Sequence, residues 1–295
     1  MGEYSGHAKE IAPVTLSTYQ MLTWRRSKDA EFEHFDLFDQ QRWGLVIYDE
    51  VHLLPAPVFR TVAWLQALRR LGLTATLVRE DGHEGDVFAL IGPKRYDVPW
   101  RELESQGWIA TARCAELRVP MPADLRLEYA TAEDRSRFRI AATNPEKSAV
   151  VRALIGRHPG ARTLVIGVYL DQLHEIAEDL GAPVLTGETR QADRDAMYAA
   201  FRDGDTPVLV ISRVGNFSVD LPDAAVAIQV SGTWGSRQEE AQRLGRVLRP
   251  KADGGEAYFY TLISQDTVEQ DCGAKRQLFL AEQGYQYTIE AWERA

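Results

Sequence analysis

The sequence lacks the features of a membrane protein or a secreted protein. No apolar run approaches the length that a membrane-spanning helix needs, and the N-terminus MGEYSGHAKE has neither the basic start nor the apolar stretch of a signal peptide. Cysteine is scarce: Cys114 and Cys272 lie far apart and form no CxxC pair, which excludes a zinc site or an iron–sulfur cluster built from them. We therefore expect a cytoplasmic protein with reduced thiols and no membrane partner.

Excess positive charge is also lacking. The formal net charge of −9 at pH 7 argues mildly against a surface devoted wholly to nucleic acid, but it leaves room for a basic channel between acidic faces. Arginine greatly outnumbers lysine, which more often reflects a GC-rich bacterial genome than phosphate binding. With 45% hydrophobic and 26% charged residues in a chain of 295, the composition is globular and the length suits two domains.

Short apolar segments alternate with longer helical patterns along the chain. Several of the apolar segments are continuous β-branched and aliphatic runs, as in parallel strands buried on both faces. We expect strands at 14–17, 45–48, 73–76, 163–168, 208–212 and 225–231. Helices are expected at 58–72, 170–181 and 190–204; these ranges end in glycine, and Thr189 is the expected N-cap of the third helix. This alternation predicts an α/β fold.

A change of character near the middle of the chain suggests a domain boundary. Residues 121–147 are charged, are bordered by prolines at 120, 122 and 145, and have room for about one helix. A new strand–helix series starts after them. The sequence therefore predicts a first lobe at 1–120, a linker at 121–147 and a second lobe at 148–295.

An acidic pair follows the expected strand at 45–48. Asp49 and Glu50 would project from the carboxyl edge of a parallel sheet, where ligands bind in such folds. Asp49 suits Mg²⁺ coordination, and Glu50 suits orienting or deprotonating a water. A plain helix N-terminus is a competing interpretation. Farther along, Thr74 and Thr76 offer hydroxyls at the end of another expected strand.

The stretch RQEEAQRLGRVLRPK at 237–251 is the most specific motif. Arg243, Arg246 and Arg249 recur every three residues and so share one side of a helix. Such guanidinium groups suit neutralising the charge of a transferring γ-phosphate. The alternative is a solvated basic face. Because a glycine inside a helix costs ~1 kcal/mol, Gly245 favours a functional interpretation.

These motifs, in this order, resemble those of the XPB family of superfamily 2 3′→5′ DNA repair helicases, and the resemblance covers essentially the whole chain. The matching stretches are VTLSTYQML (14–22), YDEVHLLPAPVFR (48–60), GLTATLVREDG (72–82), ISRVGNFSVDLPDA (211–224) and VSGTWGSRQEEAQRLGRVLRPK (230–251). The resemblance implies two RecA-like lobes with parallel sheets, the first lobe incomplete. It also implies ATP and Mg²⁺ as cofactors, and single-stranded or forked DNA as a partner bound without sequence preference.

The resemblance also assigns roles to individual residues. Catalysis falls to Asp49, which would also hold the metal, to Glu50, and to the arginine fingers Arg246 and Arg249. Nucleotide contacts fall to Asp220, Gln242 and Arg243. DNA binding or coupling falls to Thr18, His52, Thr74, Thr76, Arg79, Glu80 and Asp81. Without the family context, residues 79–81 would be a charged turn and His52 a structural histidine.

The family's phosphate-binding loop is missing. The pattern G-x-x-x-x-G-K-[ST] occurs nowhere, and GPKR at 92–95 lacks both the spacing and the hydroxyl. We expect the chain alone to hydrolyse ATP negligibly, as a truncated form, a partial gene product or one half of a split enzyme. A non-catalytic module that docks a repair nuclease or another protein is the alternative. We also expect residues 1–120 to be less stable than 145–295.

Overall fold

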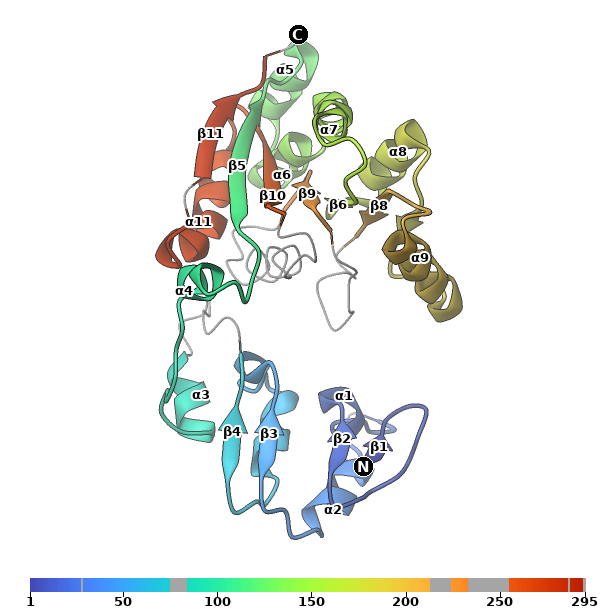
Figure 1. The fold of residues 1–295 in the computed structure, drawn as a ribbon, viewed down its shortest axis with the longest axis vertical. Coiled ribbons are helices and arrows are strands. Elements are labelled where there is room, and N and C mark those ends of the chain that lie inside the picture. Colours follow the sequence, from blue (N-terminus) through green and yellow to red (C-terminus); the bar gives the residue numbers. More distant parts are fainter. Residues whose placement is uncertain (28, 75–83, 213–223, 233–254, 286, 294–295) are drawn as a thin grey trace. The chain divides into compact units, whose positions relative to one another are not determined.

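The computed structural model describes residues 1–295 apart from 28, 75–83, 213–223, 233–254, 286 and 294–295 (Figure 1). The chain divides into two compact units, Met1–Asp97 and Val98–Ala295. This division differs from the expected boundaries at 120 and 147. The reason is that the strand Ala112–Val119, expected in the first lobe, pairs along its whole length with a strand of the second unit.

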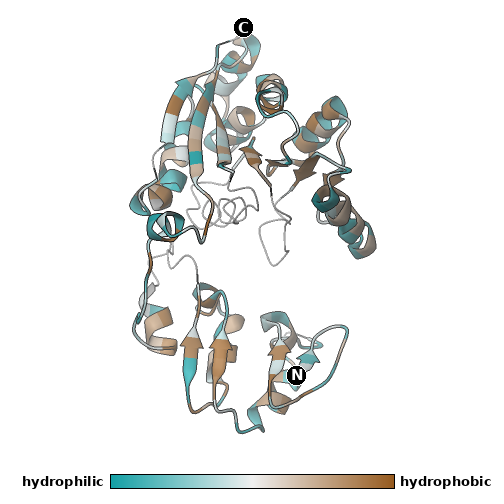
Figure 2. Ribbon diagram, in the orientation of Figure 1, coloured by the Kyte–Doolittle hydropathy of each residue, from teal (hydrophilic) through white to brown (hydrophobic). Residues whose placement is uncertain are grey.

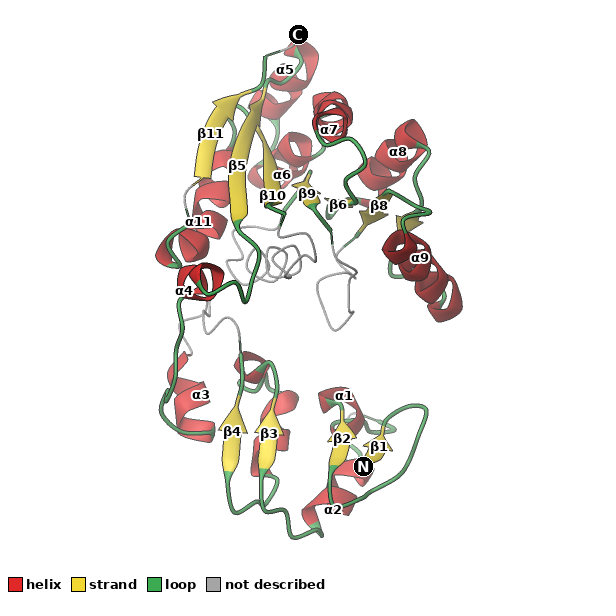
Figure 3. Ribbon diagram, viewed as in Figure 1, coloured by secondary structure: helices red, strands yellow, loops and turns green. Residues whose placement is uncertain are grey.

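The first unit is built on two separate pairs of short parallel strands. β1 (Gly2–Tyr4) pairs with β2 (Thr15–Ser17), and β3 (Val46–Tyr48) pairs with β4 (Arg70–Gly72) (Figure 3). Around them lie the helices α1 (Tyr19–Leu22), α2 (Glu33–Asp39) and α3 (Glu84–Leu90) and the 3₁₀ helices η1 (Val51–Leu53) and η2 (Phe59–Trp64). The unit therefore has short strands and short helices.

One face of these strands is poorly covered. The central residues of β2, β3 and β4 are Leu16, Ile47 and Leu71, with exposed fractions of 57%, 54% and 44%. A hydrophobic core forms on the other side of the strands, around residues such as Tyr48, Leu54 and Val62. Apolar strand residues are normally buried against another layer, so the uncovered face marks a sheet that lacks part of its packing.

The helix expected at 58–72 in the first unit is wrong, because η2 followed by β4 takes its place. Of the strand expected at 73–76, Leu73 and Thr74 lie just past the end of β4 at Gly72, and residues 75–76 lie outside the described part of the chain. The leucine, alanine and arginine residues of the stretch 58–72 favour a helix in isolation. Residues 70–72 instead form hydrogen bonds with the edge of β3 as a parallel strand. The strands expected at 14–17 and 45–48 are confirmed within a residue.

The second unit contains a seven-stranded sheet in which every pairing is parallel, with the order β11-β5-β10-β9-β6-β8-β7. Its strands are β5 (Ala112–Val119), β6 (Thr163–Ile166), β7 (Val184–Leu185), β8 (Val208–Ile211), β9 (Val226–Gln229), β10 (Ala257–Ser264) and β11 (Tyr287–Ala291). β6 and β9 are buried at every position, and Figure 2 shows the strands in the middle of the sheet as hydrophobic. This is the α/β architecture predicted from the sequence.

The helices of the second unit are α4 (Trp100–Ser105), α5 (Ala123–Thr131), α6 (Asp134–Ala142), α7 (Glu146–Arg157), α8 (Leu170–Leu180), α9 (Gln191–Asp203) and α11 (Val268–Glu282). α8 and α9 end as expected, at Gly181 and Gly204, which adopt φ values of 60° and 89°. The predicted N-cap of α9 is wrong. Arg190 occupies that position, and the Thr189 hydroxyl instead accepts a hydrogen bond from the Thr186 amide at 3.0 Å.

The segment 121–147 holds two helices, α5 and α6, rather than the single helix that its length suggested. No residue of α5 is buried. Both cysteines are buried free thiols. Within the described part of the chain, no helix combines the length and the apolar character required to cross a membrane.

Candidate functional site

The carboxyl ends of β3 and β4 lie side by side in the first unit and continue their pairing beyond the strands. The Leu73 amide donates to the Tyr48 carbonyl at 2.8 Å, and the Val51 amide donates to the Leu73 carbonyl at 2.9 Å. Gly72 is required here, because a Cβ at that position would fall 2.8 Å from Cγ2 of Val51. The acidic motif and the Thr74 region are therefore joined by the backbone.

The acidic pair occupies a sharp turn directly after β3. Glu50 adopts a left-handed conformation with φ 48° and ψ 47°, which is unusual for a residue with a Cβ. Its amide donates to Asp49 Oδ1 at 2.9 Å, and its carbonyl accepts from the Leu53 amide at 2.9 Å. Such strain costs on the order of 1–3 kcal/mol and tends to occur at functional sites. The turn separates the two carboxylates from the regular path of the strand.

Tyr19 holds the backbone of Asp49. Its hydroxyl donates to the Asp49 carbonyl oxygen at 2.6 Å. Burial, with further contributions from Tyr48, Asp49 and Glu50, raises the pKa of the Tyr19 phenol well above its ordinary value, so it remains a donor at neutral pH. The sequence motifs did not single out this residue. Its only signal was its place directly after Thr18.

Thr18 itself caps the helix that carries Tyr19. Its hydroxyl oxygen accepts a hydrogen bond from the Met21 amide at 3.1 Å, and its backbone is extended, as is typical of an N-cap. The side chain remains exposed. An exposed threonine that is predicted to contact DNA therefore directly precedes the residue whose phenol holds the acidic turn.

His52 brings three predicted residues together. The imidazole is 1% exposed, and its Nδ1 lies 2.9 Å from the Thr74 hydroxyl oxygen and 3.4 Å from Glu50 Oε2. The Glu50 side chain is 45% exposed, so the group joins a buried ring to a solvent-accessible carboxylate. A change at Thr74 would therefore reach Glu50 through one side chain.

The remaining predicted site residues lie outside the described part of the chain. They are Thr76, Arg79, Glu80, Asp81, Asp220, Gln242, Arg243, Arg246 and Arg249. Their roles remain predictions.

Among the described residues of the acidic turn, Asp49 is the carboxylate that would be available to a magnesium ion. No group of three or more histidine, cysteine, aspartate or glutamate side chains forms a metal cage in the described part of the chain. Mg²⁺ typically takes one or two protein carboxylates and completes its shell with water and phosphate oxygens. Asp49 is exposed at the end of β3 and offers such a carboxylate.

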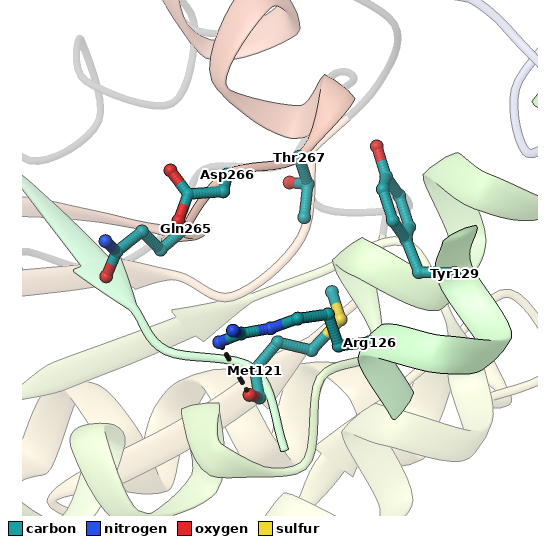
Figure 4. A pocket seen from close by; sticks show the side chains of 6 residues that line it. All are labelled: Met121, Arg126, Tyr129, Gln265, Asp266 and Thr267. Carbon is teal, nitrogen blue, oxygen red and sulfur yellow. Dashed lines mark hydrogen bonds between the residues drawn. The ribbon is translucent and has the colours of Figure 1, made fainter. Parts of the chain in front are cut away.

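The second unit contains a small pocket. Figure 4 shows that its walls come from α5, with the residue Met121 ahead of it, and from the turn between β10 and α11. Its lining residues are Met121, Arg126, Tyr129, Gln265, Asp266 and Thr267. The Arg126 guanidinium donates to the Met121 carbonyl at 3.4 Å, and the Tyr129 hydroxyl accepts from the Val268 amide at 2.8 Å. Among the residues that the structure describes, none of the predicted site residues lines this pocket.

Comparison with solved structures defines the class of fold. Saccharomyces cerevisiae Dbp5 bound to RNA and ADP BeF3 is similar, with a TM-score of 0.65, 12% identity, and coverage of 98% of this chain and 70% of that chain. At this identity the likeness concerns the fold alone, which is that of RecA-like helicase domains. The α/β, RecA-like fold predicted from the sequence is confirmed.

Sequence comparison then gives the family. The model of the ERCC3/RAD25/XPB C-terminal helicase matches residues 103–293, and that of the type III restriction enzyme res subunit matches residues 1–79. "DNA 3'-5' helicase XPB" of Mycobacterium tuberculosis is 62% identical over 289 residues, which cover 98% of this chain and 52% of the relative. The XPB subunit of general transcription and DNA repair factor IIH from Danio rerio is 43% identical, with coverage of 94% and 36%.

The chain belongs to the ERCC3/RAD25/XPB helicase family, as the sequence motifs predicted. It spans about half the length of the Mycobacterium tuberculosis relative.

Proposed function

We propose that the chain is the portion of an ATP-dependent 3′→5′ DNA helicase or translocase of DNA repair that carries the hydrolytic carboxylates and the arginine fingers. The observation that carries this proposal is the group at the carboxyl ends of β3 and β4. There Glu50, His52 and Thr74 are in contact, within a chain of the XPB family. A purely structural turn would have no need for a strained acidic residue beside a buried imidazole.

ATP and Mg²⁺ would use both motif regions. Asp49 would hold Mg²⁺, which neutralises charge on the phosphates, and Glu50 would orient the attacking water. Asp220, Gln242 and Arg243 would contact the nucleotide, while Arg246 and Arg249 would stabilise the transferring phosphoryl group. This set leaves the cradle for the phosphates to be supplied by other residues.

DNA binding would be coupled to hydrolysis through the first unit. Thr18 is exposed beside Tyr19, whose phenol holds the Asp49 carbonyl. Thr74, with Thr76 two residues on, lies against His52, which in turn contacts Glu50. Arg79, Glu80 and Asp81 would assist duplex separation. We propose single-stranded or forked DNA as the substrate, bound through its backbone without sequence preference and weakened by salt.

The phosphate cradle would come from another polypeptide segment. The sequence contains no G-x-x-x-x-G-K-[ST], and the strand residues Leu16, Ile47 and Leu71 are exposed, so a further layer would both cover them and complete the site. A separate chain that supplies the phosphate-binding half is one source of that layer. The second candidate function is a non-catalytic module that docks a repair nuclease or another protein on the same uncovered face. We also propose a cytoplasmic location, which the similarity to a bacterial helicase, 62% identical, supports.

Steady-state ATP hydrolysis tests the proposal. The chain would be assayed alone and co-expressed with the portion of the Mycobacterium tuberculosis relative that it does not match, each with and without forked DNA. We expect negligible turnover alone, DNA-stimulated turnover in the complemented form, and loss of that turnover in Glu50→Gln. Glu31→Gln, an exposed carboxylate in the same unit, is the matched control. DNA-stimulated ATP turnover by the chain alone would contradict the proposal that the phosphate cradle comes from another segment. If a stable complemented form shows no DNA-stimulated turnover, that result would favour the docking module.

A further inference from the structure

A fully buried ion pair in the second unit is the feature that the proposed function leaves unexplained. Lys147, in the first turn of α7, and Glu269, in the first turn of α11, are both 0% exposed. The Lys147 ammonium donates to both Glu269 oxygens at 2.9 Å. Burial lowers the pKa of the Lys147 ammonium, while Glu269 acts in the opposite direction. Such a pair contributes little net stability compared with a well-packed apolar pair, so its presence asks for another reason.

The pair also fixes backbone groups from three elements. Lys147 donates to the carbonyl that ends α6, Ala142, at 3.1 Å, and to the Val230 carbonyl just past β9 at 2.9 Å. Glu269 accepts from the Ser264 amide at the end of β10 at 2.9 Å. The ends of α6, β9 and β10 are therefore tied to one charged centre.

Three consecutive residues follow β9, and we call them the stem (Val230–Gly232). The Val230 amide donates to the Ile166 carbonyl at 2.9 Å, and its carbonyl accepts from Lys147. The Ser231 hydroxyl accepts from the Val168 amide at 2.9 Å.

Gly232 completes the stem against a second buried cation. A Cβ at Gly232 would fall 2.7 Å from Cζ of Arg276, whose side chain is 1% exposed. Only glycine allows the guanidinium to lie this close to the chain. Hydrogen bonds thus hold Val230 and Ser231, and the chain at Gly232 packs closely against Arg276, immediately before residues 233–254.

We propose that Lys147, Glu269 and Arg276 are positioning residues that fix the stem. Residues 233–254, which carry Arg243, Arg246 and Arg249, follow the stem directly in the sequence, so the stem would fix the point from which they continue. The inference rests on the proposed function for the role of those arginines, but not for the placement of the stem. An ammonium that shares its protons among two carbonyls and a carboxylate defines direction as well as distance, which an apolar side chain does not.

The test separates positioning from stability. Lys147→Met leaves Glu269 buried without its cation and is expected to destabilise the protein strongly. The double variant Lys147→Met with Glu269→Gln removes both charges, and we expect its melting temperature to recover most of that loss. Hydrogen exchange of the Val230 amide, measured on the segment 224–232, should nevertheless be about tenfold faster than in wild type. DNA-stimulated ATP turnover of the complemented protein should fall by about tenfold or more.

A folded double variant with wild-type exchange and wild-type turnover would overturn the proposal, because a purely structural pair is restored once stability returns. If the double variant does not fold, Arg276→Lys tests the proposal instead, because it keeps the charge but loses the planar group beside Gly232. Faster amide exchange at the stem is then expected, and unchanged exchange refutes the proposal. The exposed pair on α7 and α8, changed as Arg152→Met with Asp179→Asn, is the matched control. If the complemented wild-type protein shows no ATP turnover, the proposed function fails. Amide exchange at the stem still tests the positioning role of Lys147, Glu269 and Arg276.

Discussion

The Nδ1 atom of His52 lies 2.9 Å from the hydroxyl oxygen of Thr74, although the two residues belong to different strand ends. The buried imidazole also contacts Glu50, so the contact joins the region predicted to respond to DNA with the residue predicted to orient water. The motif order in the sequence predicted that these segments act together. The structure adds the atoms through which they meet.

Replacing the Thr74 hydroxyl should weaken coupling rather than folding. We expect Thr74→Val, which keeps the side-chain shape, to lower DNA-stimulated ATP turnover of the complemented protein by about fivefold, since a hydrogen bond is worth ~1 kcal/mol. Basal turnover without DNA should change less. Thr74→Ser retains the hydroxyl and should behave like wild type. Equal DNA stimulation of ATP turnover in Thr74→Val and Thr74→Ser would show that the His52–Thr74 contact does not couple DNA binding to hydrolysis.

The two units should differ in resistance to protease. The first unit has two separate strand pairs with Leu16, Ile47 and Leu71 exposed, while the second has one seven-stranded sheet. Because local stability follows buried apolar contact, limited proteolysis of the chain alone should cut within residues 1–97 first and leave a resistant fragment from 98–295. Mass spectrometry of the fragments checks this. Cleavage of both units at the same rate would contradict it.

The close approach at Gly167 should make alanine costly there. A Cβ would fall 2.8 Å from Leu173 Cδ2 and 2.9 Å from the Ser231 hydroxyl, both in the packed interior. We expect Gly167→Ala to lower the free energy of unfolding by about 1–3 kcal/mol. Gly156→Ala on α7 is the control, since no atom lies within 4 Å of the added methyl group and helix propensity would add up to ~1 kcal/mol. Chemical denaturation of both variants measures the difference.

Stability of the second unit should fall in mild acid because of His158. Burial, with Arg157 adding to the effect, lowers the pKa of His158, whose Nε2 lies 2.8 Å from the Tyr260 hydroxyl. As the pH falls below the ordinary value of 6.5, the unfolded chain takes up a proton that the folded chain does not. The free energy of unfolding therefore decreases from that pH downward, through the lowered pKa.

The variant His158→Gln should reduce this dependence. Melting temperatures recorded from about pH 7 to about pH 5 would show a shallower decline than in wild type, because one proton-linked group has been removed. His174→Gln, an exposed position on α8, is the control and should follow the wild-type curve. A decline as steep in His158→Gln as in wild type would assign the acid sensitivity to other groups.

Periodicity predicted the elements whose stability is local. α8 and α9 follow from their helical patterns, and Gly181 and Gly204 end them in left-handed conformations. β5 was not predicted, because its sequence ARCAELRV mixes charged with apolar residues. Its Glu116 is buried all the same, and accepts from Arg118 and Gln277. β5 forms because its partners lie far along the chain, and a prediction from a short stretch of sequence does not include those partners.

The same limit applies to the candidate site. Motif order placed Asp49 and Glu50 after a strand, and β3 is there. The Tyr19 phenol on the Asp49 carbonyl and the buried Lys147 are tertiary features, because their partners are distant in sequence. The left-handed conformation of Glu50 was not predicted either. A lysine near a helix start ordinarily predicts a solvated side chain, so nothing local distinguishes Lys147.

The position of β5 between β10 and β11 has a consequence for the order of folding. Both hydrogen-bonding edges of β5 are satisfied by strands that follow residue 256 in the chain. During synthesis β6, β8 and β9 emerge together and pair with one another, while β5, made before them, waits for both neighbours. We expect the sheet to form from its middle and to close last around its earliest strand, which leaves β5 as the segment longest exposed to chaperones and to aggregation.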